Sequence, residues 1–116
     1  MFHLMCRDPY LLWLAATLGV EAVAVLAAVG CRLIASGVGA PWMLAAVVSM
    51  NLLTHPLAAM ASAVGDWSWL PIEMAVVAAE AMAFRVLARV AWPAAWGLSA
   101  AANCLTAAIG WTWAVC

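Results

Sequence analysis

The side chains best suited to chemistry in this chain are acidic, imidazole and amide groups set inside long apolar stretches. Asn51, Thr54 and His55 precede Pro56 in the sequence N-L-L-T-H-P, at the centre of one such stretch. The candidates in the other stretches are Glu21, Glu73, Glu80 and Asn103. Carboxyl and imidazole groups can share, hold and pass a proton. They are also ligands for a divalent metal, and the predicted metal pair is His55 and Glu80.

The composition places these groups in a membrane protein. Of the 116 residues, 71% are hydrophobic and 8% are charged, and the mean hydropathy is +1.13. A soluble domain has about 25% charged residues, so this chain cannot cover a surface that faces water. The four basic residues are all arginines and form no patch, which excludes nucleic acid as a partner. We expect a single transmembrane domain over residues 1–116, with the lipid bilayer as its surroundings.

The elements that carry the candidates are predicted to be four transmembrane helices in an up-down bundle, so the fold class is all-α. Their ranges are about 10–34, 42–64, 71–90 and 94–116, each near the roughly 20 residues that a bilayer requires. Turns rich in Gly and Pro separate them. No internal repeat is apparent along the chain.

The arginines predict the orientation. Arg7 lies in the N-terminal head, whereas Arg32 falls in the first connection and Arg85 and Arg89 near the third. Basic residues favour the cytoplasmic side, so both termini are expected on the periplasmic side of a bacterial inner membrane. Whether the terminal cysteines pair, Cys6 with Cys116, is left open.

Depth along the helices places the candidates in one layer. With a rise of about 1.5 Å per residue, Asn51 and Asn103 lie roughly 13 Å from the cytoplasmic ends of their helices. Glu80 lies at roughly 15 Å, and Glu21 and His55 lie at roughly 19 Å. Each of the four helices therefore contributes to a polar layer close to the bilayer midplane.

Helical spacing aligns the candidates on common faces. Asn51 and His55 share a face, and Pro56 is expected to kink the helix and free the carbonyl of Leu52. Glu73 lies on one stripe with the later glutamate, nearer the outer side. An alternative role for it is to cap the helix start, where the dipole favours negative charge. Similar stripes are Thr17 with Glu21, and Ser99 with Asn103 and Thr106.

Each of these residues also has a purely structural interpretation. Asn51 and Asn103 can act as hydrogen-bonding links between helices, worth about 0.6 kcal/mol each in membranes. Glutamate favours function more strongly, because an acidic group at the bilayer centre costs roughly 2.5–3.5 kcal/mol. His55 could also ligate a haem or chlorophyll-type ring, although tight alanine-rich helices offer no flat slot for one.

The pattern also resembles a family. The resemblance rests on three motifs: N-x-x-T-H-P in one helix, E-x6-E-A in the next, from Glu73 to Ala81, and an asparagine in the last. In these motifs the chain is similar to small uncharacterised four-helix membrane proteins of bacteria. The resemblance covers about residues 45–110, and it implies no activity.

Two functions follow most directly. The first is a Glu/His/Asn site that binds a proton or metal ion and serves in transport, within a homo-oligomer. The second is an accessory subunit of a larger electron-transfer or pigment complex, in which the polar layer fixes helix packing. An intramembrane enzyme is a third option, but the chain has no H-E-x-x-H or G-x-S-x-G motif. The cofactor is unknown, with a divalent metal or none as the choices.

Overall fold

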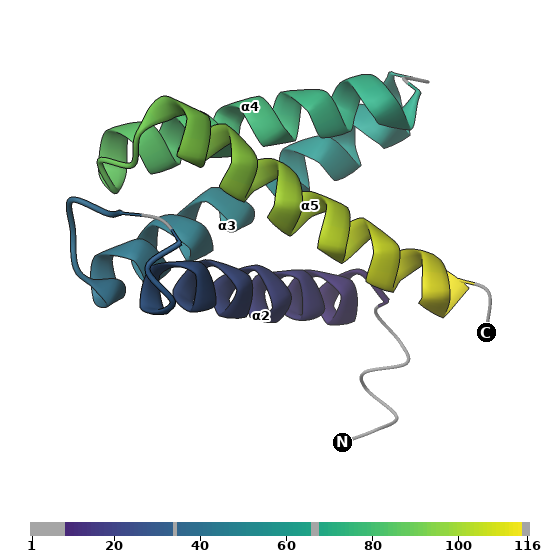
Figure 1. The fold of residues 1–116 in the computed structure, drawn as a ribbon. Coiled ribbons are helices and arrows are strands. Elements are labelled where there is room, and N and C mark those ends of the chain that lie inside the picture. Colours follow the sequence, from purple (N-terminus) through teal and green to yellow (C-terminus); the bar gives the residue numbers. More distant parts are fainter. Residues whose placement is uncertain (1–8, 34, 66–67, 115–116) are drawn as a thin grey trace.

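The part of the chain that the structure describes folds into four α-helices (Figure 1). The computed structural model describes residues 9–33, 35–65 and 68–114, and these contain no strand. The helices are α2 (Pro9–Gly30), α3 (Ala40–Val64), α4 (Trp69–Leu87) and α5 (Trp92–Ala114). The prediction of an all-α fold with four helices is confirmed for these residues. The predictions that concern Cys6, Arg7 and Cys116 lie outside the described residues.

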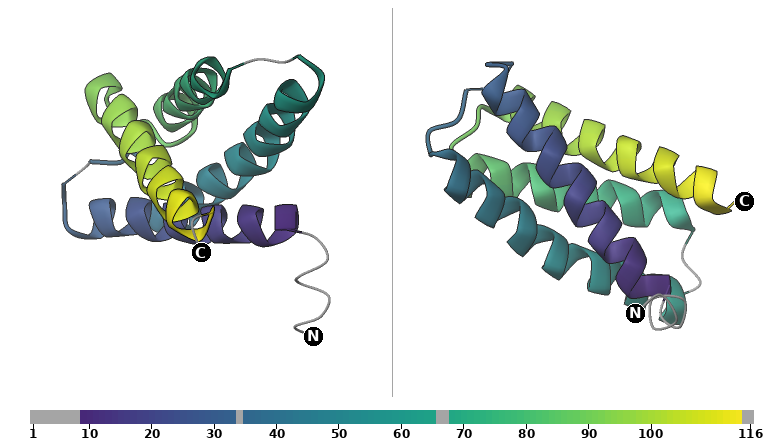
Figure 2. Two further views of the ribbon diagram at one scale, coloured as in Figure 1. Left: turned by 90° about the vertical axis from the view of Figure 1, so that its right-hand side faces the viewer. Right: turned by 90° about the horizontal axis from the view of Figure 1, so that it is seen from below.

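The helices run alternately up and down, so that α2 and α5 have their free ends on the same side (Figure 1). Each helix packs against two others: α2 and α4 each contact α3 and α5. The pairs α2 with α4 and α3 with α5 therefore lie diagonally opposite across the bundle (Figure 2). Side chains from all four helices can reach the middle of this arrangement.

Prolines lie in the first turns of three helices. Pro41, Pro71 and Pro93 follow the first residues of α3, α4 and α5, which begin slightly earlier than predicted. The first N–H groups of a helix have no intrahelical partner, so a proline costs nothing there. Pro56 lies inside α3, which continues through it from Ala40 to Val64.

The end of α2 explains why this helix is shorter than predicted. Arg32 adopts a left-handed conformation with φ of 57°. The N–H of Leu33 bonds the carbonyl of Ala28 at 2.9 Å, and that of Arg32 bonds Val29 at 3.0 Å. This pattern closes the helix at its C-terminus. After α4, Arg89 has the same left-handed conformation, with φ of 54°.

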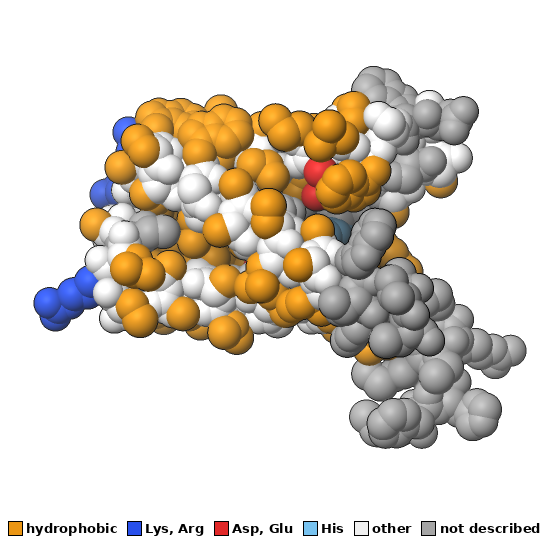
Figure 3. All heavy atoms as spheres, turned by 45° about the vertical axis from the view of Figure 1, so that its right-hand side comes forward, with side chains coloured by type: hydrophobic (Ala, Val, Ile, Leu, Met, Phe, Trp, Pro, Cys, Tyr) orange, Lys and Arg blue, Asp and Glu red, His pale blue; other side chains and the backbone are white. Residues whose placement is uncertain are grey.

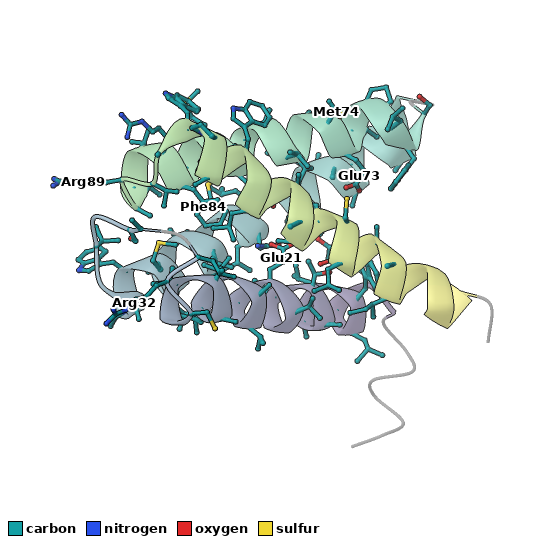
Figure 4. The ribbon with its side chains drawn as sticks, in the orientation of Figure 1. Glu21, Arg32, Glu73, Met74, Phe84 and Arg89 are labelled. Atoms are coloured by element: carbon teal, nitrogen blue, oxygen red, sulfur yellow. The ribbon has the colours of Figure 1, made fainter. Side chains whose placement is uncertain are left out.

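Hydrogen bonds join the connection after α2 to the connection after α4. Gly37 N–H donates to the carbonyl of Ala88 at 3.0 Å, and the Ser36 hydroxyl approaches the same oxygen at 3.1 Å. A Cβ atom at Gly37 would lie 2.6 Å from the Cβ of Arg89, so the close approach requires glycine. Arg32 and Arg89 thus lie at the same end of the bundle (Figure 4).

Apolar side chains form both the buried core and much of the surface. Val25, Met43, Val47, Phe84 and Leu98 belong to the buried core, whereas large apolar side chains cover much of the outside (Figure 3). Two segments, Tyr10–Gly30 and Ala40–Ala61, are long and apolar enough to cross a membrane. Four membrane spans stay a prediction.

Candidate functional site

Glu21 is held at the interface between α2 and α3. Its side chain is 2% exposed. Asn51 Nδ2 donates to Glu21 Oε2 at 2.6 Å, and its second hydrogen reaches the carbonyl of Val47 at 3.0 Å. The amide group is therefore anchored on its own helix and oriented toward the carboxyl group of the neighbouring helix.

Glu80 has a matching environment between α4 and α5. It is 3% exposed. Asn103 Nδ2 donates to Glu80 Oε2 and also to the carbonyl of Ser99, the latter at 2.9 Å. The Ser99 hydroxyl lies 3.1 Å from Glu80 Oε2 and 3.0 Å from the carbonyl of Val77.

A single helix, α5, joins the two carboxyl groups. Thr106, one turn beyond Asn103, places its hydroxyl 3.5 Å from Glu21 Oε1 and 3.0 Å from the carbonyl of Ala102. Asn103 contacts Glu80. Polar contacts therefore connect all four helices, but the link from α5 to α2 is made by Thr106, which was not predicted as a site residue.

The two buried carboxyl groups have no cation beside them in the described part of the chain. Arg32 and Arg89 lie at one end of the bundle, away from Glu21 (Figure 4). Arg85 is exposed and approaches the carbonyl of Val90 at 3.5 Å, and the chain has no lysine. Glu80 is close enough to Glu21 for two negative charges there to repel each other. A buried carboxylate without a cation is costly, so protonation is the available way to neutralise these groups.

The hydrogen count around Glu80 also accommodates a proton. A serine hydroxyl has one hydrogen to donate, yet Ser99 Oγ lies within bonding distance of two acceptor oxygens. If Ser99 donates to the carbonyl of Val77, a protonated Glu80 can donate to the Ser99 oxygen. The contacts of Ser99 with Val77 and with Glu80 are then both hydrogen bonds at the same time. An ionised Glu80 has no hydrogen to donate, so the single hydrogen of Ser99 could serve only one of them.

A cavity of about 590 Å³ lies next to this network. It is lined by residues from all four helices, namely Tyr10, Trp13, His55, Ala58, Ala59, Trp69, Ile72, Glu73, Asn103, Thr106 and Ala107. Asn103 and Thr106 are also the residues that contact the two buried carboxyl groups. The cavity therefore leads to the amide and hydroxyl groups that hold Glu80 and Glu21.

Glu73 faces this cavity and does not cap a helix. The alternative that it caps the helix start is wrong, because α4 begins at Trp69 and has no acidic residue in its first turn. The indole of Trp69 lies beside the half-buried Glu73 carboxyl group. His55 lines the same cavity and is also half-buried.

Four buried polar atoms in the described residues have no hydrogen-bond partner in the protein: Thr17 Oγ1, Asn51 Oδ1, His55 Nε2 and Glu80 Oε1. Thr54, the remaining predicted site residue, is buried and donates to the carbonyl of Met50 at 2.9 Å. The layer therefore keeps unused donors and acceptors for a proton, water or ligand.

A metal centre has less support in this geometry. Among residues 9–33, 35–65 and 68–114, no group of three His, Cys, Asp or Glu side chains could hold a metal ion. His55 lines the cavity, whereas Glu80 does not. A metal bound by His55 and Glu80 stays a prediction, and the described residues offer it no third ligand of these types.

The structure reveals an internal repeat that the sequence analysis missed. Hairpin α2–α3 contains E-A-V-A-V from Glu21 and N-L-L-T from Asn51, and hairpin α4–α5 contains E-A-M-A-F from Glu80 and N-C-L-T from Asn103. Pro41 and Pro93 precede the two asparagines by the same spacing. Each hairpin supplies one glutamate bound to its own asparagine.

Burial follows the same repeat. The matched pairs that are buried in both hairpins include Thr17 with Val76, Val25 with Phe84, Met43 with Ala95, Ala46 with Leu98, Val47 with Ser99, and Thr54 with Thr106. The packing of α2 and α4 against the same two helices completes the relationship. The two hairpins therefore repeat each other in sequence, in burial and in the helices that they contact.

Ser99 and Thr106 contact the buried carboxyl groups but were not predicted as site residues. Both lie on the polar stripe predicted for the last helix, and Thr106 repeats the position of Thr54 after asparagine. This repeated N-x-L-T is the signal that would have identified Thr106. Nothing in the first hairpin predicts Ser99, because its counterpart is Val47.

No family model, curated protein or solved structure matches this chain.

Proposed function

We propose that this chain is a small polytopic membrane protein that binds and releases protons at Glu21 and Glu80, as part of coupled transport. The observation that carries the proposal is the burial of two carboxyl groups, each bound by an amide donor and without a cation beside it among the residues that the structure describes. The cavity gives protons a route to them past His55 and Glu73.

A proton suits the site better than a metal ion. The two carboxyl groups take separate asparagine partners at two different helix interfaces, α2–α3 and α4–α5. A metal needs several ligands around one point, whereas a proton needs only one oxygen and an acceptor. When the Ser99 hydroxyl donates to the carbonyl of Val77, its oxygen is such an acceptor for a protonated Glu80.

The accessory-subunit alternative has support from the same hydrogen bonds. Asn51 links α2 to α3, Asn103 links α4 to α5, and Thr106 links α5 to α2. A layer of this kind would fix helix packing within a larger assembly. Glutamine distinguishes the two functions, because it has nearly the shape of protonated glutamate and, like it, both donates and accepts hydrogen bonds, but it has no titratable proton.

The proposed surroundings are a bacterial inner membrane with both termini on the periplasmic side. Three arginines lie near the connections after α2 and α4, which agrees with a cytoplasmic location of that end. A homo-oligomer, or assembly with other membrane subunits, is part of the proposal, since large apolar side chains remain on the outside.

Labelling with a hydrophobic carbodiimide tests the proposal, because this reagent modifies protonated carboxyl groups in apolar sites. In mild detergent we expect mass spectrometry to find adducts at Glu21 and Glu80, with yields that fall as the pH rises. Glu21→Gln and Glu80→Gln should each remove one adduct and leave the other. Absence of adducts at both residues throughout the pH range, with the fold intact, would reject proton binding and leave the packing function.

A further inference from the structure

The cavity next to the carboxyl groups lies where the two hairpins repeat each other. Tyr10 in the first hairpin matches Trp69 in the second, and Trp13 matches Ile72. All four line the cavity. The space is therefore lined by equivalent positions of both hairpins.

Polar residues break the repeat at this cavity. Glu73 stands where the first hairpin has Leu14, and His55 stands where the second has Ala107. Both polar residues line the cavity. The repeat explains the two glutamates of the central layer, but it does not explain Glu73 and His55, so these require a separate reason.

The chemistry of the cavity wall favours an organic cation. Glu73 supplies a carboxyl group, and no arginine lines the described wall. Tyr10, Trp13 and Trp69 supply aromatic rings, whose faces attract ammonium groups. His55 leaves its buried Nε2 without a partner, so it can accept or donate a hydrogen bond to a ligand.

An apolar groove continues from the cavity. It has a volume of about 370 Å³ and lies between α3 and α4. Its walls are almost wholly apolar, and it shares Ala58 and Ile72 with the cavity. A ligand with its charge beside Glu73 would therefore have an adjoining place for an apolar substituent.

We infer that the cavity and the adjoining groove bind an organic ammonium ion that carries an apolar group. The ammonium lies between Glu73 and the rings of Trp13 and Trp69, and the apolar group lies along Ala58 and Ile72. This inference builds on the proposed function, because the ligand would reach Asn103 and Thr106, which hold the two proton-binding carboxyl groups.

Calorimetry tests the inference by measuring how phenyltrimethylammonium binds to the full chain in a nonionic detergent. Tetramethylammonium lacks the apolar group, and tert-butylbenzene has the same shape without the charge. We expect phenyltrimethylammonium to bind more tightly than both. Glu73→Gln should weaken its binding by about tenfold or more, the change that loss of 1.4 kcal/mol produces. Trp69→Leu should weaken it several-fold.

The outcomes separate this inference from the proposed function. Equal binding of phenyltrimethylammonium by the parent and a folded Glu73→Gln variant, or no binding by the parent, would overturn the ammonium site. Carbodiimide adducts at Glu21 and Glu80 would be unaffected by that result. Conversely, Glu21→Gln and Glu80→Gln should abolish the adducts and keep the protein able to bind phenyltrimethylammonium. If Glu73→Gln does not fold, Trp69→Leu provides the same test, and undiminished binding by it would overturn the site.

Discussion

Asn51 holds Glu21 across the interface of α2 and α3, with its Nδ2 2.6 Å from Oε2. The same amide bonds the carbonyl of Val47, so both of its hydrogens are used within the protein. In the second hairpin Asn103 does the same for Glu80. Two equivalent amide–carboxyl pairs therefore form the centre of the fold.

Replacement of the amide should destabilise the bundle. Asn51→Leu leaves Glu21 buried with its principal donor removed, and we expect the free energy of unfolding to fall by about 1–3 kcal/mol. Circular dichroism would measure this change by monitoring unfolding in mixed micelles. Cys104→Ala is the control, because Cys104 is exposed beside Asn103, and it should change stability by less than about 0.5 kcal/mol. Equal stability of both variants would refute the structural importance of the pair.

Two glycine substitutions should have opposite effects. At Gly37 an added methyl group would press against Arg89 in the contact between the two connections. Gly37→Ala should lower the free energy of unfolding by about 1–3 kcal/mol. Gly97 lies within α5 with no neighbour near its Cβ position, so Gly97→Ala should raise it by up to about 1 kcal/mol. A Gly37→Ala variant as stable as Gly97→Ala would show that the connections do not require this close approach.

Cysteine labelling can determine the orientation. Cys31 is exposed next to Arg32, at the end predicted to face the cytoplasm. In a variant that keeps only this cysteine, a membrane-impermeant maleimide should react in inside-out vesicles and fail to react in intact spheroplasts. Labelling from the outside alone would place the arginine-rich end in the periplasm and reverse the proposed topology.

The helices could be predicted from the sequence because long apolar stretches alternate with Gly- and Pro-containing turns. Their ends could not be predicted as well. The first helix was predicted to reach residue 34 because the apolar stretch was taken to set its length. The helix ends at Gly30 because Arg32 adopts a left-handed conformation. The starts of three helices were placed slightly late, because proline is tolerated inside the first turn.

The polar layer could be predicted in part. Depth along the helices predicted a common layer for Glu21, Asn51, Glu80 and Asn103, and the structure joins them in two amide–carboxyl pairs. Spacing along one helix says nothing about which neighbour a side chain meets, so the pairing required the tertiary structure. The cavity that places Glu73 near His55 also depends on how the helices diverge, which hydropathy does not determine.

The most direct test of the account is infrared spectroscopy of the protein in mild detergent at neutral pH. A protonated carboxylic acid has a carbonyl stretch distinct from that of a carboxylate. We predict this band in the parent and in Glu73→Gln, and its loss in the double variant Glu21→Gln/Glu80→Gln. A parent without the band, or a double variant that retains it, would contradict the claim that Glu21 and Glu80 hold protons in the folded bundle.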